Sequence, residues 1–334
     1  LSSDATFGKG LFTFSGIAGA VGEGAVAGDI NAVLKDGRPH LTGALTLDTL
    51  DLAPFAAMVF GEASLEGEGT KWPSEPFAGS MSLPVTAALD IVAGTASAGL
   101  LGVGENVSFS GTLDADGLRI ADLKAAVHGG VLTGLVEIKN NGGTGMLSGQ
   151  AKLAGADLEG LFEGGGLKGR ADVTASLSAS GKTIEGLIAS LAGSGTAKAT
   201  GLVITGLDAR AFGKIIAKAD AIGRDIDAPG TAAFAPELVG GGSFDAGEAD
   251  FAFTLAGGVL RAPPVSLANE AATLTASLRA DLNTATIAAD GEISYAPGDE
   301  ALIGSEPAVR FAAEGVPGAM TVRLDTEPLA QFLT

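Results

Sequence analysis

The most regular feature of the chain is the alternation of apolar and polar residues in short runs. Runs of this kind cover 26–32, 132–138 and 274–280, and others occur at 107–113, 173–179, 249–255, 309–313 and 320–324. A period of two places every apolar side chain of a strand on one face of a sheet. The pattern therefore predicts a mostly β, mainly antiparallel architecture.

The alternating pattern also repeats. Residues 118–153 align without a gap on residues 260–295, and residues 26–47 join the same alignment. Each copy is an alternating run, a turn and a second alternating run. The turns are Lys35-Asp36-Gly37, Asn140-Asn141-Gly142-Gly143 and Asp281-Leu282-Asn283. Asx and Gly residues supply the positive φ angles of tight hairpins, so each copy predicts a hairpin.

Short amphipathic helices are predicted between some strands. Residues 47–55 resemble residues 324–332, and 153–162 is a weaker copy; each is interpreted as a strand, an Asp or Thr N-cap and a short helix. Apolar residues at helical spacing predict longer helices over 183–191 and 208–222, ended by Gly193 and Gly223. The Gly-, Pro- and Ala-rich stretch 229–247 is predicted to be a loop.

The composition of the chain limits the classes of molecule that it can bind. The chain has 334 residues, a net charge of −19, 52 glycines and no cysteine. Phosphate backbones are bound mainly through Lys and Arg, so the acidic surplus argues against nucleic acid. The mean hydropathy is +0.36, yet the most apolar stretch, 85–103, is broken by Asp90 and several glycines and predicts no membrane span. Half-buried strands, or a long apolar groove, would explain this hydropathy.

Catalytic and metal-binding motifs are weak. His40 and His128 lie far apart in the sequence, and neither belongs to a cluster of metal ligands. The stretch 164–169 matches G-x-G-x-x-G but precedes a strand instead of opening a helix, so we interpret it as a turn. Asp225 and Asp227, like Asp114 and Asp116, lack the further ligands of a calcium loop. We predict no catalytic residue, no metal and no cofactor.

Several segments, taken in order, resemble the AsmA-like C-terminal region. These segments are 71–77 (Lys-Trp-Pro-Ser-Glu-Pro-Phe), 88–91, 128–134, 167–169, 181–183, 190–195 and 201–208. The resemblance is best over 41–222, and a further repeat copy covers about 249–334. Ala78 departs from the pattern, because an acidic residue is expected after the Trp-containing loop.

The resemblance implies a bacterial envelope protein. AsmA-family proteins are anchored in the inner membrane, extend through the periplasm and are thought to hold phospholipids in an apolar β trough. By this resemblance we expect one repeat-built β-groove segment, 1–334, of a longer periplasmic protein whose anchor lies outside this chain. The expected fold is a long, antiparallel, curved sheet (a trough or groove) with a few short helices.

The apolar rows of the strands form the candidate site. We expect a lipid-binding inner face for acyl chains lined by Val26, Ile30, Leu45, Leu47, Leu132, Val136, Ile138, Phe251, Phe253, Leu255, Leu274, Leu278 and Ile293. The alternative is a closed core between two packed sheets. Small residues such as Gly134 and Ala276 favour the groove slightly, because in a closed core they would leave voids.

Three functions remain open at this point. The preferred one is non-enzymatic binding of lipid acyl chains, in phospholipid transport between the inner and outer membranes. The second is a scaffold or assembly factor for outer-membrane proteins that acts through edge-strand pairing. The third, an enzyme acting on envelope glycans, has the least support, because no paired carboxylates stand out.

Overall fold

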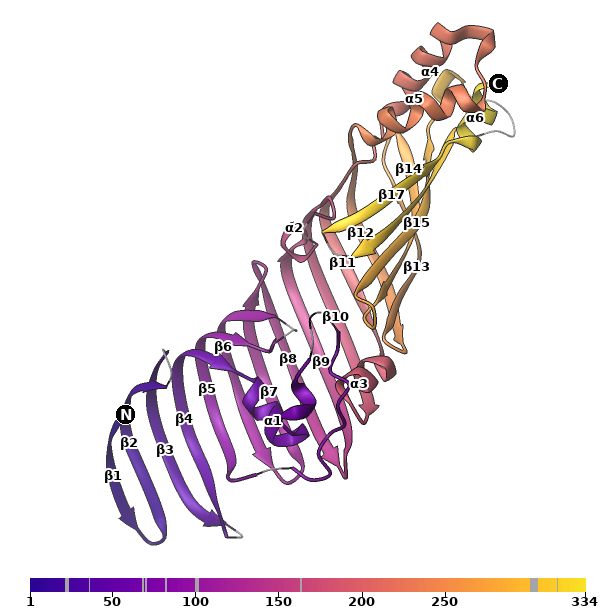
Figure 1. Cartoon of the computed structure of the whole chain (residues 1–334). Helices are drawn as coiled ribbons and strands as arrows, with labels where there is room; N and C mark the ends of the chain where they lie inside the picture. The colour runs from indigo at the N-terminus through magenta and orange to yellow at the C-terminus, as the bar shows by residue number, and fades with distance from the viewer. Residues whose placement is uncertain are drawn as a thin grey trace. The chain divides into compact units, whose positions relative to one another are not determined.

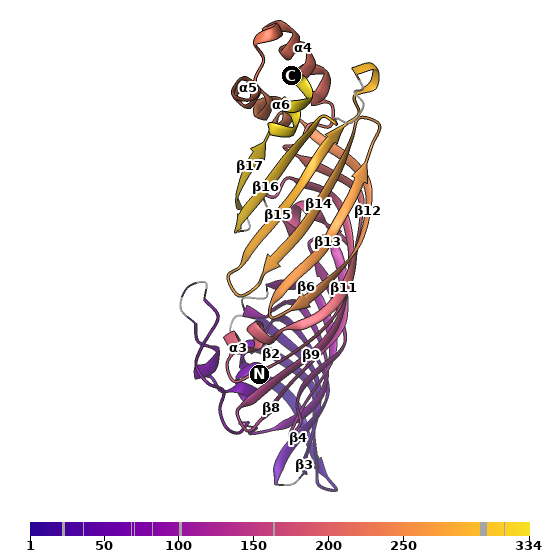
Figure 2. The ribbon, with the colours of Figure 1, turned by 90° about the vertical axis from the view of Figure 1, so that its right-hand side faces the viewer.

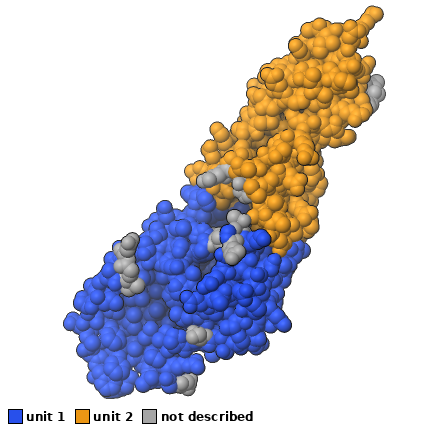
Figure 3. All heavy atoms as spheres, viewed as in Figure 1, with its two compact units in different colours: residues 1–154, 173–194, 255–258 blue, residues 155–172, 195–254, 259–334 orange. Residues whose placement is uncertain are grey.

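The computed structural model describes residues 1–21, 24–35, 37–67, 69, 71–81, 83–99, 102–162, 164–300, 306–316 and 318–334. The protein is mostly β, as predicted: one long, open and largely antiparallel sheet of 17 strands carries a few short helices (Figures 1 and 2). Contacts divide the chain into two compact units, coloured separately in Figure 3. Unit 1 comprises residues 1–154, 173–194 and 255–258, and unit 2 comprises 155–172, 195–254 and 259–334.

The elements follow one another in chain order. The first nine strands are β1 (Ser2–Gly8), β2 (Leu11–Val21), β3 (Gly24–Lys35), β4 (Arg38–Asp51), β5 (Thr86–Ser97), β6 (Val103–Asp114), β7 (Gly117–Val127), β8 (Gly130–Asn141) and β9 (Thr144–Asp157). The others are β10 (Leu167–Gly181), β11 (Ala192–Thr205), β12 (Ser243–Ala256), β13 (Val259–Ala268), β14 (Ala272–Asp281), β15 (Thr286–Tyr295), β16 (Ala308–Val316) and β17 (Ala319–Asp325). The α-helices are α1 (Ala53–Phe60), α2 (Leu158–Leu161), α3 (Ile184–Ser190), α4 (Ala211–Ile222), α5 (Ala228–Gly240) and α6 (Glu327–Leu333).

The repeat predicted from the sequence appears as hairpins of matching register. In β3–β4, Val26 pairs with Leu47, and at the aligned place in β8–β9 Leu132 pairs with Leu153. In β14–β15 the register moves by two residues, so that Leu274 pairs with Ile293 and not with Tyr295. The cause is the longer connection between Asp281 and Thr286. A shift of two keeps every side chain on its face, so the alternation survives.

One connection departs from the simple meander. β4 and β5 are parallel neighbours, with Leu45 beside Ile91, whereas the other neighbouring strands of known register are antiparallel. A parallel pair needs a long crossover, because the chain must return to the starting end of the sheet. Residues 52–85 form this crossover and contain α1.

The predicted helices are mostly present. Asp157 caps α2 by accepting from Glu159 N at 3.0 Å, and Thr183 caps α3 by accepting from Gly186 N at 2.8 Å. α4 begins at Ala211, three residues after the predicted start, because the Asp208 carboxylate accepts from Arg210 N at 2.8 Å and fixes a turn first. Gly223 ends α4 as predicted.

The predicted loop over 229–247 is wrong. Residues 228–240 form α5, and β12 begins at Ser243. Asp227 caps the helix by accepting from Gly230 N at 2.7 Å, and Pro229 lies in the first turn, where proline needs no hydrogen-bond partner. Thr231, Ala235 and Val239 are buried on one side of α5, so tertiary burial overrides a composition that is poor in helix formers.

A search for membrane-crossing segments finds no helix of sufficient length and apolarity in the part of the chain that the structure describes.

Glycines at paired positions allow the strands to approach one another closely. Gly28 (φ +147°) lies opposite Leu45, and a Cβ atom at Gly28 would overlap the carbonyl oxygen of Ala44. We expect Gly28→Ala to lower the free energy of unfolding by about 1–3 kcal/mol through backbone strain. Thermal and urea unfolding followed by circular dichroism measures this loss.

The matched control is Gly79→Ala, because a Cβ atom at this exposed position would have no neighbour within 4 Å. This variant should unfold with the wild type. Equal stability of Gly28→Ala and the wild type would show that the strands can separate at no cost.

Candidate functional site

In unit 1, the predicted lipid-facing residues share one face of the sheet. Val26 pairs with Leu47, Leu45 lies beside Ile91, and Leu132 pairs with Leu153 in the same alternating row. Ile30, Val136 and Ile138 fall on this row as well, because alternate residues of a strand point to the same side. We call this row, in either unit, the uncharged face.

The opposite row carries the charges. In β3, β4, β8 and β9 the alternate positions facing the other way include Asp29, Asp48, Glu137, Lys139 and Lys152, and the uncharged face of these strands has no acidic or basic side chain. Arg119 and Glu137 pair across β7 and β8 on the charged side. The charge that keeps the protein in water is therefore confined to one side of the sheet.

The uncharged face of unit 1 has a tightly packed middle. The buried cluster there consists of Ile91, Ala93, Ala96, Val107, Phe109, Ile120 and Ala125, with Leu45, Leu47 and Leu132 packed against it. The sequence analysis did not select the β5–β7 members of this cluster. Asp122, which has a positive φ angle, interrupts the period of two in β7, so Ile120 and Ala125 do not belong to one alternating run.

Towards β1 the same face opens to solvent. Phe7 pairs with Phe12, and Phe14 pairs with Ile30, so these rings extend the uncharged face to the edge strand. Phe7 is 66% exposed and Phe12 is 45% exposed, with ring centroids 4.4 Å apart. Large exposed apolar groups that adjoin one another indicate a contact surface.

The glycines of this face have a structural role that differs from the one predicted. They were expected to leave space above the sheet, but a Cβ atom at Gly134 would overlap the carbonyl oxygen of Gln150 on β9. Large residues lie opposite glycines in several pairs, for example Ile30 with Gly43 and Val136 with Gly149. The glycines therefore permit close strand packing next to large side chains.

In unit 2 the uncharged face is partly closed by helices. Leu274 and Ile293 pair across β14 and β15 and are buried beneath α4, α5 and α6, which lie at one end of these strands (Figure 2). The helices contribute Phe212, Ile215, Val239, Leu329 and Phe332 to this core. These two predicted site residues thus lie in a closed core.

The other predicted residues of unit 2 lie on the same face or on the neighbouring strand. Leu278 pairs with Ala262 and Ala289 and is partly exposed, four residue pairs farther from the helices than Leu274. Phe251 and Phe253 of β12 alternate with the exposed residues Asp250, Ala252 and Thr254; Phe253 is buried and Phe251 partly exposed. Leu255 of β12 is buried and falls within unit 1. On β17 Val322 is 57% exposed, so the face opens away from the helices.

The remaining candidates from the sequence do not converge. His40 Nδ1 lies 2.8 Å from Thr86 Oγ1, on the charged row of β4, while His128 occupies the turn between β7 and β8. Asp227 is the cap of α5, and residues 164–166 lie in the connection between α2 and β10. Among the described residues, no three His, Cys, Asp or Glu side chains gather as metal ligands.

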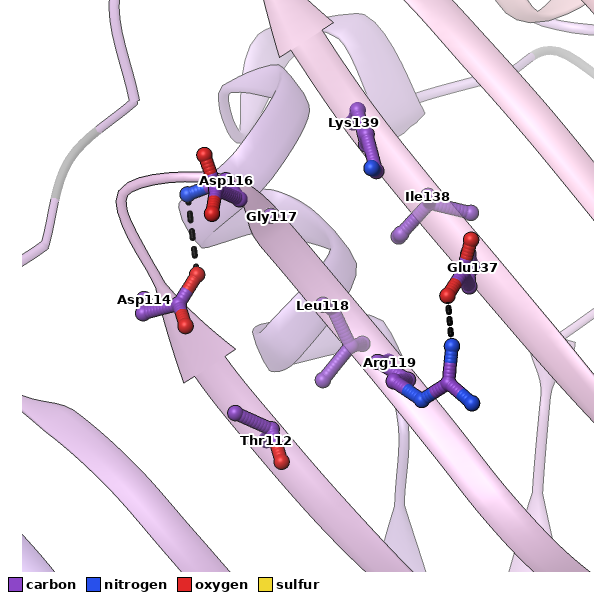
Figure 4. A pocket seen from close by; sticks show the side chains of 9 residues that line it. All are labelled: Thr112, Asp114, Asp116, Gly117, Leu118, Arg119, Glu137, Ile138 and Lys139. Carbon is purple, nitrogen blue, oxygen red and sulfur yellow. Dashed lines mark hydrogen bonds and ion pairs between the residues drawn. The ribbon is translucent and has the colours of Figure 1, made fainter.

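A small hollow lies at the β6–β7 turn (Figure 4). It has a volume of about 170 Å³ and is lined by Thr112, Asp114, Asp116, Gly117, Leu118, Arg119, Glu137, Ile138 and Lys139. Asp116 N donates to Asp114 Oδ1 at 2.8 Å, which closes the turn. Charged side chains from Asp114, Asp116, Arg119, Glu137 and Lys139 line the hollow, and so it does not suit an acyl chain.

No protein family, curated protein or solved structure matches this chain. The site must therefore be judged on its own geometry.

Tyr295 provides a test of the closed core in unit 2. Its ring stacks on Phe212 at 6.0 Å, it is 3% exposed, and among the described residues its hydroxyl has no hydrogen-bond partner. Burial, and to a smaller extent the charge of Asp208, raises the pKa of Tyr295 above its usual value of 10.0. The neutral phenol is therefore favoured in the folded state.

We expect unit 2 to lose stability as the pH rises above 10, because the unfolded chain releases this proton first. Tyr295→Phe should remove that loss and leave neutral-pH stability equal or higher by about 1 kcal/mol, since it deletes an unpaired buried hydroxyl. Tyr295 is the only tyrosine, so ultraviolet absorbance titration reports its pKa directly. A wild-type phenol that titrates near its usual value would contradict the closed core.

Proposed function

We propose that this chain is a non-enzymatic segment that binds lipid acyl chains on its uncharged face. The observation that carries the proposal is the separation of charge: in strands of both units, one row of side chains is apolar and the other holds the charged residues. A sheet with one solvated face normally covers its apolar face with a second layer. Here the helices close only part of that face, and Phe7, Phe12 and Val322 stay exposed.

The energetics suit an alkyl ligand. Each buried methylene contributes about 0.8 kcal/mol, so an acyl chain of about sixteen carbons could gain roughly 12 kcal/mol on such a surface. Apolar contact has no preferred direction, and a surface without charged anchors would allow the chain to slide. These properties support movement of lipid along the sheet.

The resemblance to the AsmA-like region supports the same interpretation. It suggests a bacterial envelope protein in the periplasm, held to the inner membrane by a segment outside this chain, that moves phospholipids between the inner and outer membranes. The acidic surplus, −19 for the whole chain, opposes charge-driven adhesion to anionic membranes. Contact with lipid would then depend on the uncharged face.

The test is a charge placed on that face. Val136→Asp and Leu278→Asp should each abolish co-purification of phospholipid and reduce its uptake from phosphatidylethanolamine–phosphatidylglycerol vesicles at least tenfold, because a buried carboxylate beside an alkyl chain is costly. Solvent extraction of detergent-free protein followed by mass spectrometry measures the bound lipid.

Matched controls come from the same strands. Val131→Asp in β8 and Thr275→Asp in β14 place the same charge on the opposite face and should retain lipid. Circular dichroism establishes that each variant is folded. Folded wild-type protein that contains no lipid and takes up none from vesicles would overturn the proposal.

The second candidate function is a scaffold for outer-membrane proteins that pairs through an edge strand. It is favoured by β1, which pairs with β2 and whose seven residues are all exposed. Exposed strand edges without Lys or Pro are open to pairing with another strand. Ala5→Pro, which removes a backbone donor that points away from β2, would then abolish partner binding while lipid binding persists.

A further inference from the structure

The crossover between β4 and β5 lies on the uncharged face of unit 1. Asn140 pairs with Gly145, in step with Ile138 and Leu147, so both residues belong to the uncharged face. The Asn140 side-chain amide donates to the carbonyl oxygens of Val59 and Ala78, each at 2.8 Å. We call residues 53–61 and 72–78 the strap. Figure 1 shows its helix, α1, beside β7 and β8, which it contacts.

Two aromatic rings of the strap rest on a glycine of the sheet. Phe60 and Phe77 stack with centroids 4.3 Å apart and are 3% and 5% exposed. A Cβ atom at Gly145 would lie 2.9 Å from Phe60 Cε1 and would overlap the ring of Phe77. The rings therefore occupy the place above Gly145 that an apolar ligand on this face would need.

The strap is hydrogen-bonded to another part of unit 1 through residues 73–77 and contacts the sheet beneath it through few groups. Phe77 N donates to Lys182 O at 2.8 Å, and Glu185 N donates to Pro73 O at 2.9 Å, which ties the strap to the β10–α3 corner. The strap is hydrogen-bonded to the side chain of Asn140 on β8, and its two rings make apolar contact at Gly145 on β9. A short helix held by a few contacts opens at lower cost than the sheet beneath it.

We propose that the strap is an autoinhibitory cover: Phe60 and Phe77 occupy part of the uncharged face, and an acyl chain binds there by displacing them. This inference rests on the proposed function and adds its regulation. Apolar contacts are not directional, so an alkyl chain can replace two rings on the same surface. The apparent affinity is then reduced by the fraction of molecules in which the strap is open.

Two variants weaken the strap in different ways. Phe77→Ala removes one ring. Asn140→Ser loses the amide donor to the two carbonyl oxygens, keeps a side-chain oxygen able to accept from Gly143 N, and places no charge on the uncharged face. Asn141→Ser is the matched control, because this exposed neighbour lies on the opposite face of the same hairpin.

The experiment is a titration of each folded protein with a fluorescent fatty acid of palmitate length. Phe77→Ala and Asn140→Ser should bind the probe roughly tenfold more tightly than the wild type, because the competing cover is weakened. Asn141→Ser should bind like the wild type. Equal or weaker binding by both folded strap variants would overturn the proposal, since rings that merely lined the site would lose affinity when removed.

Hydrogen exchange separates this proposal from the one on which it rests. On addition of the probe, amides of β8 and β9 should gain protection while those of α1 lose it. Protection of the strands together with α1 would mean that the strap closes over the ligand, and the displacement proposal would fail while lipid binding stood. Protein whose strands gain no protection, in the wild type and in both strap variants, would overturn the proposed function and the strap with it.

Discussion

The structure depends on one constraint: a strand has two faces, and this sheet places its charges on only one of them. Asp29, Glu137 and Glu292 lie on the charged face of their strands. The residues that alternate with them are apolar and lie on the uncharged face. A shift of one residue in any register would exchange these rows and place carboxylates among Leu and Ile side chains. Burial of the apolar row and exposure of the acidic row therefore fix the register of each hairpin.

The apolar row then requires a cover, and the protein uses different means along the chain. In unit 2, α4, α5 and α6 enclose Leu274 and Ile293 in a conventional core. In unit 1, the β4–β5 crossover brings Phe60 and Phe77 onto the sheet at Gly145, and neighbouring side chains in β5–β7 bury one another. The face is least covered where the helices and the crossover do not reach.

Alternation predicted much of this from the sequence, because a period of two is a local property of each strand. Strands such as β6 and β12 and the hairpin copies follow the prediction, and even the two-residue change of register in β14–β15 leaves Leu278 on its face. α5 was missed because its stability comes from packing Ala235 and Val239 against other elements, which composition does not show. The strap was missed because its contacts join residues about eighty positions apart, such as Val59 and Asn140.

The local pattern is sufficient to predict which residues of the alternating strands share the apolar face and where hairpin turns such as 140–143 lie. Those features depend on spacing and turn chemistry within a few residues. Which parts of that face are covered depends on the folded chain, because the cover comes from distant segments: α4 to α6 over Ile293, and the crossover over Gly145. Leu274 and Leu278 occupy equivalent positions in the same alternating run. Leu274 is buried in the core because helices pack on it, whereas Leu278 lies beyond the helices and is partly exposed.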